Sequence, residues 1–316
     1  MRLFRFLARW LKNSFKLATG QPPIISCREN LFRLALLRGF GINVRALLTC
    51  RGLPSEGVGS QVILTIHAMA FARITGMKYV HTPFVHLAHA NRPDDWEEHF
   101  QLGHDELTAA DDWRVIDYAL NFRRLHRRFG VTLGETQREV ARLLPVLKER
   151  YWRDRITTGN RRLQICVHVR RGDVNKEHHP GMWIPTASIE RTISAIKAVL
   201  TAQGLEYDLT IFSQLGGEDL ASLGRLEIDG NPVSASAQMV AADILVSGKS
   251  CFSYVAGLLS AGVVLAPDWG PVWFDSVELQ TGPPALPNWI IVDKQGRFDT
   301  DLLELNLKKR ATRLLQ

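Results

Sequence analysis

Two arginines stand directly after a short apolar run in LQICVHVRRGD, residues 163–173 of the chain. The run from Leu163 to Val169 predicts a buried strand, which would deliver Arg170 and Arg171 to one edge of a sheet. An arginine offers a planar fork of donors that stays charged at physiological pH and can hold two phosphate oxygens. This pattern indicates binding of a phosphate-bearing ligand. In transfer from a nucleotide sugar, a fixed cation at this position would stabilise the leaving diphosphate.

Three nearby features support this chemistry. Gly172 would let backbone approach a phosphate, and Asp173 would orient an arginine through an ion pair. Ser250 begins an apolar helix after ILVSG, and a helix N-terminus favours an anion. The simpler alternative is an arginine pair in a surface turn. The apolar run directly before both arginines makes this alternative less favoured.

Composition limits the class of protein. With 316 residues the chain fits two domains of roughly 150 residues each, and 46% hydrophobic with 22% charged residues indicates an ordinary folded protein. The net charge of +7 would attract nucleotides, anionic lipid or nucleic acid, without choosing among them. The cysteines lack metal-ligand spacing, so we expect free thiols in a reducing compartment. They are Cys27, Cys50, Cys166 and Cys251.

Residues 1–20 have the pattern of a basic amphipathic helix. Five basic residues, spaced three or four apart, face an apolar stripe that contains Phe4, Leu7, Leu11 and Phe15. Residues 1–19 would then suit the surface of an anionic bilayer, or alternatively would pack on the domain with a solvated basic face. Charges interrupt any signal-peptide core, and no stretch reaches the ~20 apolar residues of a membrane span. We therefore expect a cytoplasmic protein, peripheral on the cytoplasmic face of the inner membrane.

The remaining chain alternates strand and helix signals. A first series predicts a strand over 43–52, a glycine-rich turn, a helix over 62–76 and a strand over 77–84. Residues 91–155 form long charged helical segments, and ITTGN at 156–160 has the composition of a linker. A second series follows, with strands over 163–169, 207–213, 244–248 and 263–267 and helices over 185–203, 216–224, 237–242, 250–262 and 299–315.

These elements predict an α/β, GT-B-like fold with two doubly wound, Rossmann-like domains facing a central cleft. The N-terminal α/β domain, on the acceptor side, would span 21–158 with a helical insertion at 91–155. The C-terminal domain, which would bind the nucleotide sugar, would span 159–316.

Three islands of the chain resemble a known superfamily. VHVRRGD at 167–173 is similar to the signature of the α1,2-fucosyltransferases and of their α1,6- and protein O-fucosyltransferase relatives, which share an H-x-R-R core. The stretch 57–79 resembles their G-x-G-N-Q loop and the helix after it. IFSQ at 211–214, with 239–267, resembles their strand ending in FSDD and their later S-S-F-S segment. The resemblance covers most of residues 43–270.

The resemblance implies a GT-B architecture, with GDP-fucose as donor substrate, no cofactor and inverting transfer to a hydroxyl without a metal. Carried over, His168 would contact the guanine side of the nucleotide, and Arg170 would contact the β-phosphate. Arg171 and Asp173 would support that loop. Beside the diphosphate would lie Ser250, and the opposite wall of the cleft would be formed by Gly57, Gly59 and Gln61. The acceptor would be a glycan or lipid-linked oligosaccharide.

The chain departs from the superfamily at several positions, and these departures weaken the donor assignment. Ser60 replaces the expected asparagine, Cys251 replaces a serine, and Tyr254 and Val255 replace tryptophans. IFSQ lacks both acidic residues of FSDD, and Ala235 stands roughly where the α1,6 relatives have an aspartate against guanine. Another GDP-sugar, or a non-catalytic GDP-sugar-binding protein, remains open.

The catalytic base has several candidates. An inverting transfer needs a carboxylate or imidazole within hydrogen-bond reach of the acceptor hydroxyl. Glu177 follows the arginine loop near a glutamate of the α1,6 relatives, and the pair Asp105 and Glu106 is its rival from the N-terminal domain.

Two other classes of function receive less support. His168 with His178 and His179 would be a poor zinc site because adjacent histidines have the wrong geometry, so we expect no metal. The basic cluster from Arg123 to Arg128 permits nucleic-acid binding, but no nucleic-acid fold motif accompanies it. We therefore expect no nucleic-acid partner.

Overall fold

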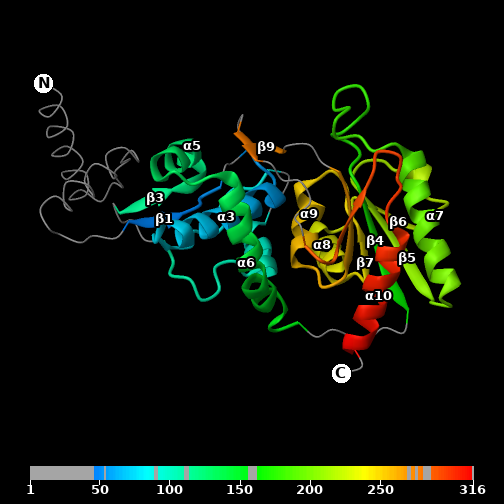
Figure 1. Cartoon of the computed structure of the whole chain (residues 1–316). Helices are drawn as coiled ribbons and strands as arrows, with labels where there is room; N and C mark the ends of the chain where they lie inside the picture. Colours follow the sequence, from blue (N-terminus) through cyan, green and yellow to red (C-terminus); the bar gives the residue numbers. More distant parts are fainter. Residues whose placement is uncertain are drawn as a thin grey trace, which may run out of the picture.

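The computed structural model describes residues 46–52, 55–88, 92–109, 114–155, 162–268, 272–274, 277–279 and 286–314. The amphipathic segment 1–20 and the linker 156–160 lie outside these ranges. Within them the chain forms two α/β units, each built around its own parallel sheet (Figure 1). The predicted fold class, two Rossmann-like α/β units, is confirmed.

The N-terminal unit contains a three-stranded parallel sheet of order β2-β1-β3. Its strands are β1 (Leu47–Thr49), β2 (Lys78–Tyr79) and β3 (Val115–Asp117), and its helices are α3 (Val58–Thr75), α4 (Pro93–Phe100), α5 (Tyr118–Phe129) and α6 (Leu133–Trp152). Because β3 pairs with β1, the segment 91–155 completes the sheet and is no helical insertion. The prediction missed β3 because three residues are too few to show alternation between charged helices.

Helix α3 is apolar on nearly all sides because it is buried on nearly all sides, in contact with α5, α6 and α9. It is long and apolar enough to cross a membrane by composition, yet 78% of it is buried inside the protein. The helix begins at Val58, four residues before the predicted start, and ends at Gly76, which has a left-handed φ of 68°. The expected glycine-rich turn therefore contains the first turn of α3.

The C-terminal unit contains a six-stranded parallel sheet of order β11-β8-β7-β4-β5-β6. Its strands are β4 (Leu163–Val169), β5 (Tyr207–Ser213), β6 (Arg225–Ile228), β7 (Ile244–Val246), β8 (Val263–Pro267) and β11 (Trp289–Val292). From β4 the chain continues through β5 to β6 at one edge of the sheet. It then returns to β7, on the other side of β4, and continues through β8 to β11 at the opposite edge. The order therefore reverses between β4 and β7, and ligands of α/β sheets bind at the carboxyl ends of strands at such a switch point.

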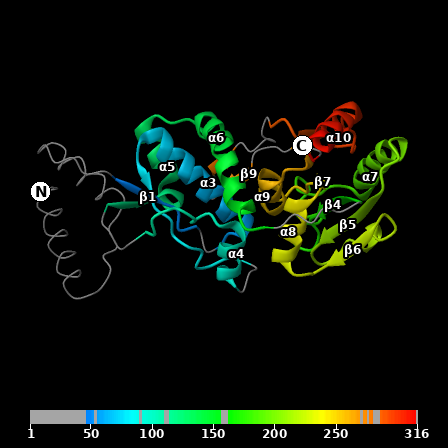
Figure 2. The same ribbon diagram turned by 90° about the horizontal axis from the view of Figure 1, so that it is seen from below.

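Helices cover both faces of this sheet (Figures 1 and 2). One core cluster joins the sheet to α7 (Thr186–Ala202) and α10 (Thr300–Leu314), on the outer face. The other face carries α8 (Pro232–Ala241) and α9 (Cys251–Leu259). Helix α8 starts earlier than predicted because Asn231 caps it and Pro232 occupies its first turn. A short 3-10 helix (Glu218–Leu220) and an antiparallel pair, β9 (Val272–Phe274) with β10 (Val277–Leu279), complete the described elements.

One apolar core joins the two units. The cluster around α3 continues into α8 and α9, and the contacts α3–α9, α4–α8 and α6–α9 cross between the units. Polar contacts reinforce it: the Trp152 indole N–H donates to the Leu259 carbonyl at 3.3 Å, and Lys148 Nζ donates to the Ser260 carbonyl at 2.6 Å. A large apolar interface resists relative motion of domains, so the two walls of the space between them keep a fixed relation.

Candidate functional site

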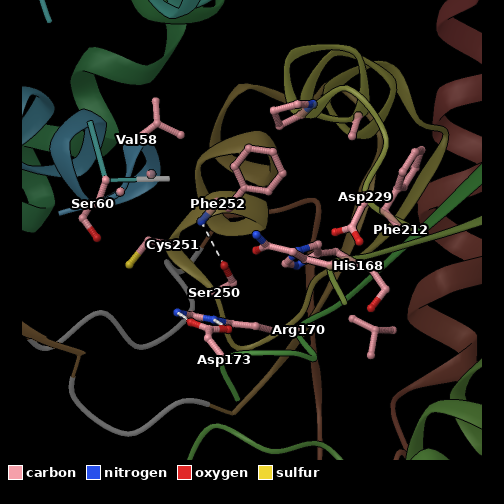
Figure 3. A pocket seen from close by; sticks show the side chains of 18 of the residues that line it. Val58, Ser60, His168, Arg170, Asp173, Phe212, Asp229, Ser250, Cys251 and Phe252 are labelled. Atoms are coloured by element: carbon pink, nitrogen blue, oxygen red, sulfur yellow. Dashed lines mark hydrogen bonds and ion pairs between the residues drawn. The ribbon is translucent and has the colours of Figure 1, made fainter. Parts of the chain in front are cut away.

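A cavity of about 570 Å³ lies between the units, at the carboxyl ends of β4, β5 and β6 and the N-termini of α3 and α9. The N-terminal unit contributes Ser55, Glu56, Gly57, Val58, Gly59, Ser60, Ala88 and Trp96. The C-terminal unit contributes His168, Val169, Arg170, Asp173, Met182, Phe212, Ser213, Gln214, Glu227, Asp229, Gly230, Pro232, Ala235, Ser250, Cys251 and Phe252. Figure 3 shows side chains from both units facing this space.

Arg170 lines the cavity directly after β4, as the apolar run predicts. Asp173 holds its guanidinium in a bidentate pair, with Nε donating to Oδ1 at 3.1 Å and Nη2 donating to Oδ2 at 2.5 Å (Figure 3). Within the described residues Arg170 Nη1 makes no hydrogen bond, so one edge of the fork remains for an anion. Gly172, with φ of 78°, makes the tight turn between the two residues. A β-carbon there would come within 2.8 Å of Leu215.

Arg171 is buried and does not line the cavity. Its Nη2 donates to the Ile184 carbonyl at 3.1 Å, and its guanidinium lies 3.8 Å from the centre of the Trp183 ring. Desolvation by burial lowers the pKa of Arg171, against the opposing charge of Asp219. The side chain thus ties the two ends of the 171–184 loop together.

His168 lines the cavity at the end of β4, and its Nδ1 lies 3.0 Å from Ser253 Oγ on α9. Burial lowers the pKa of His168 to about 4, and the neighbouring Arg170 charge contributes to the shift. The imidazole is therefore neutral near pH 7. A neutral ring can form hydrogen bonds with a ligand without adding charge to the site.

The N-termini of two helices meet at the cavity. Ser250 caps α9 by accepting from the Phe252 N–H at 3.3 Å, whereas Gly57 begins α3 without a side-chain cap. A β-carbon on Gly59 would lie 2.5 Å from backbone atoms of Cys251 and Phe252, so the two helix ends are in direct backbone contact. The starts of both helices therefore line the same cavity, and the positive end of a helix dipole favours an anion nearby.

Gln61 does not line the cavity, in contrast to the prediction that it would form the wall with Gly57 and Gly59. It is buried behind that wall, where its Nε2 donates to the carbonyls of Glu56 at 3.1 Å and His86 at 2.7 Å. Its side chain lies close to Gly52, where a β-carbon would overlap the amide group of Gln61. Gln61 thus anchors the loop that carries Glu56.

The predicted catalytic bases lie away from the cavity. Glu177 is exposed in the 171–184 loop, where its N–H donates to Asn175 Oδ1, and it is absent from the lining. Asp105 pairs with His104 at 2.9 Å, and the hydrogen bond from His104 lowers the pKa of the carboxyl. Glu106 pairs with Arg150 at 2.8 Å. None of the three lines the cavity; the loop of Glu177 reaches the cavity only through Asp173 and Met182.

Three carboxylates that sequence reasoning missed do line the cavity: Glu56 from the N-terminal unit, and Glu227 and Asp229 at the end of β6. Glu227 pairs with Arg225 at 2.7 Å, and Asp229 Oδ1 accepts the Leu215 N–H at 3.2 Å. Asp229 has a left-handed φ of 53°. The signal was the acidic end of RLEID before the Asn231–Pro232 helix start, which marks a strand end at the same sheet edge.

Potential metal ligands and thiols add little to the site. Within the described ranges, no group of three or more His, Cys, Asp or Glu side chains is arranged to hold a metal ion. Cys50, Cys166 and Cys251 are free thiols. Burial raises the pKa of Cys251, which lines the cavity, to about 11, so its thiol stays protonated near neutral pH.

The chain is similar to several solved structures, two of which are described below. One is a crystal structure of POFUT1 in complex with GDP, with a TM-score of 0.36 and 10% identity, covering 70% of this chain and 98% of that chain. The other is glycosyl transferase family 9 from Veillonella parvula DSM 2008, with a TM-score of 0.32 and 12% identity, covering 86% of this chain and 97% of that chain. None of the known family models matches the chain, and no curated protein matches it in sequence.

Proposed function

We propose that this chain is a glycosyltransferase that binds a GDP-sugar in the cavity between its two units. The sugar is L-fucose, transferred with inversion to a hydroxyl of a glycan or lipid-linked oligosaccharide. One observation carries the proposal: the guanidinium of Arg170 and the N-termini of α3 and α9 surround the same cavity. A diphosphate is the ligand that such a convergence of fixed positive groups suits best.

The diphosphate is the leaving group in this reaction. As the bond to the sugar breaks, negative charge grows on the β-phosphate, and preorganised donors beside it lower the barrier. Arg170 supplies a full charge, and Ser250 with the first N–H groups of α9 supplies partial charges. The bidentate hold of Asp173 on Arg170 keeps the guanidinium in place before the donor arrives.

The nucleobase would lie beyond His168, between Phe212, Pro232 and Ala235, with Asp229 at its edge. Guanine presents two adjacent N–H donors on its Watson–Crick edge, and a carboxylate can accept both. Asp229 Oδ1 already accepts the Leu215 N–H, and the carboxylate faces the cavity (Figure 3). Asp229 thus compensates for Ala235, which replaces an aspartate of the resembling family. Adenine and uracil lack this pair of donors.

The base is Glu56, the carboxylate that lines the cavity from the N-terminal unit. An inverting transfer needs its base on the side of the sugar opposite to the leaving group. Arg170 and Ser250 lie on the C-terminal wall, so the opposite wall carries the base. Two hydrogen bonds fix the backbone of the Glu56 loop: its carbonyl accepts from the Ala88 N–H at 3.1 Å and from Gln61 Nε2 at 3.1 Å.

Calorimetry with GDP, ADP and UDP tests nucleotide binding, and hydrolysis of GDP-fucose and GDP-mannose tests the chemistry. Arg170→Ala is expected to weaken GDP binding by about 2–4 kcal/mol, the cost of removing one partner from a desolvated charged contact. The same variant is expected to abolish turnover. Arg191→Ala, on the exposed side of α7, is the matched control. Near-normal turnover in Arg170→Ala would refute the mechanism. GDP binding without turnover of any sugar would identify a non-catalytic GDP-sugar-binding protein.

Two further variants separate the roles of the carboxylates. Asp229→Asn is expected to lower the affinity for GDP about tenfold or more and to leave UDP affinity unchanged, because a hydrogen bond to a charged acceptor contributes about 1.5–3 kcal/mol. Glu56→Gln is expected to lower turnover at least a hundredfold with GDP affinity unchanged, the range for general-base catalysis. If Asp229→Asn lost affinity equally for all nucleotides, Asp229 would have no part in recognising the guanine base.

The acceptor and the location at the cytoplasmic face of the inner membrane belong to the same proposal. They rest on the basic amphipathic pattern of residues 1–19. Flotation with anionic vesicles tests this part: a chain that lacks residues 1–19 is expected to bind less. Unchanged vesicle binding would show that residues 1–19 do not bind the membrane. It would not bear on the proposed binding and transfer of the GDP-sugar.

A further inference from the structure

Helix α5 presents a face of arginines to solvent. Its sequence, YALNFRRLHRRF, contains no acidic residue, and Arg123, Arg124, Arg127 and Arg128 are all exposed. Successive residues turn by about 100° around a helix, so these four arginines share one face with Leu120. The opposite face packs Tyr118, Phe122 and Leu125 into the core.

Arg124, Arg127 and Arg128 differ from several other exposed arginines of the described chain. Arg92, Arg162 and Arg297 each form an ion pair with a nearby carboxylate. In the described part of the chain, Arg124, Arg127 and Arg128 form no ion pair and no side-chain hydrogen bond. Their charges therefore add to one another, and the face carries a local positive field.

Leu120 adds an exposed apolar side chain to the N-terminal end of this face. Its side chain is 69% exposed, the largest exposed fraction among the large apolar residues described in the structure. It lies one turn before Arg123 and Arg124 on the same face. Phe129, at the helix end, is different: it is 40% exposed but packs edge-on against Phe71, with 5.8 Å between ring centres.

We propose that the exposed face of α5 is a docking surface for an anionic lipid bilayer. Arginine forks pair with phosphate and carboxylate headgroups, and an exposed leucine on the same face can enter the headgroup boundary. A surface that binds single-stranded nucleic acid usually has exposed aromatic rings on which bases stack. The exposed apolar side chain on this face is that of a leucine, Leu120. In Figures 1 and 2, α5 lies on the side of the N-terminal unit away from the C-terminal sheet. A bilayer on this face leaves the C-terminal unit in water.

The proposal for this surface does not rest on the pattern of residues 1–19 or on the proposed transferase activity. The test uses the full-length chain and sedimentation with vesicles of phosphatidylcholine containing about 30% phosphatidylserine, the anionic lipid of the cytoplasmic leaflet. The variant is Arg124→Gln, Arg127→Gln and Arg128→Gln together, because glutamine keeps helix propensity. The matched control removes the same charge from the C-terminal unit, by Lys294→Gln, Lys308→Gln and Lys309→Gln.

Each basic residue near an anionic surface contributes about 1 kcal/mol, or about fivefold in partitioning. The α5 variant is expected to lose at least tenfold in vesicle binding, with circular dichroism unchanged, while the control stays within about threefold of wild type. Leu120→Ser is expected to weaken binding further at raised salt. Equal losses in the α5 variant and the control would overturn the proposal, as would equal binding of wild type to pure phosphatidylcholine. Loss of single-stranded RNA binding with vesicle binding unchanged would assign the face to nucleic acid instead.

Discussion

The contact between Gly59 and the start of α9 gives the sharpest test of the site. A β-carbon at Gly59 would lie 2.5 Å from Cys251 C and Phe252 N, both backbone atoms. No side chain can rotate to relieve that overlap, so the N-termini of α3 and α9 would have to separate by about 1 Å. Overpacking of this kind costs about 1–3 kcal/mol, and a shift of about 1 Å at a catalytic site can cost a hundredfold in rate.

For Gly59→Ala, the sign of the change in the free energy of unfolding distinguishes two explanations. If helix propensity alone mattered, alanine inside α3 would stabilise the protein by up to about 1 kcal/mol. The contact with α9 predicts the opposite, a decrease of about 2 kcal/mol in the free energy of unfolding. Because both helix N-termini line the cavity, GDP affinity is expected to fall at least tenfold.

Gly57→Ala is the matched control, two residues earlier at the same cavity. A β-carbon there would meet only the Ala88 carbonyl oxygen, at 3.9 Å, which is ordinary contact. The loss of a glycine N-cap is expected to cost no more than about 1 kcal/mol, with GDP affinity kept within about threefold. Urea unfolding and calorimetry with GDP measure both variants. A Gly59→Ala protein as stable as wild type, with the same GDP affinity, would refute the helix-to-helix contact.

Three further predictions follow from the same structure. Asp173→Asn is expected to lower hydrolysis of GDP-fucose at least tenfold with GDP affinity within about threefold, because asparagine cannot hold the Arg170 fork by two acceptor oxygens; parallel losses in affinity and rate would show that Asp173 binds rather than orients. Burial lowers the pKa of His67 to about 4 from 6.5, so the unfolded chain binds the extra proton first and stability falls as pH drops below about 6.5. His67→Leu is therefore expected to remove about 2 kcal/mol of the stability loss between pH 7.5 and pH 5, measured by urea unfolding; an unchanged slope would contradict the assignment. Glu177→Gln is expected to keep turnover within about twofold, and a tenfold fall would restore Glu177 as the base.

Features with a local cause were predictable from the sequence. The apolar run before Arg170 predicted β4 at its observed bounds, Leu163–Val169, and placed the arginine at the sheet edge. Ser250 was predicted at the start of a helix, and it caps α9. Both predictions rest on neighbours within a few residues. The fold class followed in the same way from the alternation of strand and helix signals.

Features that depend on contacts distant in sequence were not predictable. The strand β3 is three residues long and exists because β1 lies beside it, and β6 exists because β5 lies beside it. Asp229 reaches the cavity only through β6, so the acidic end of RLEID indicates a site only once that short strand is recognised beside β5. Glu177, close to Arg170 along the chain, was favoured on proximity that the exposed loop does not preserve.

Gly59 shows most clearly how the two kinds of information combine. The resemblance of residues 57–79 to a G-x-G-N-Q loop implied that Gly59 would form a wall of the cleft, and Gly59 lines the cavity. Gly59 lies inside α3, and its missing β-carbon admits the backbone of Cys251 and Phe252. This glycine makes room for a second helix, a role that the sequence pattern did not predict. The contact holds the N-termini of α3 and α9 together at the cavity, which the proposed diphosphate site requires.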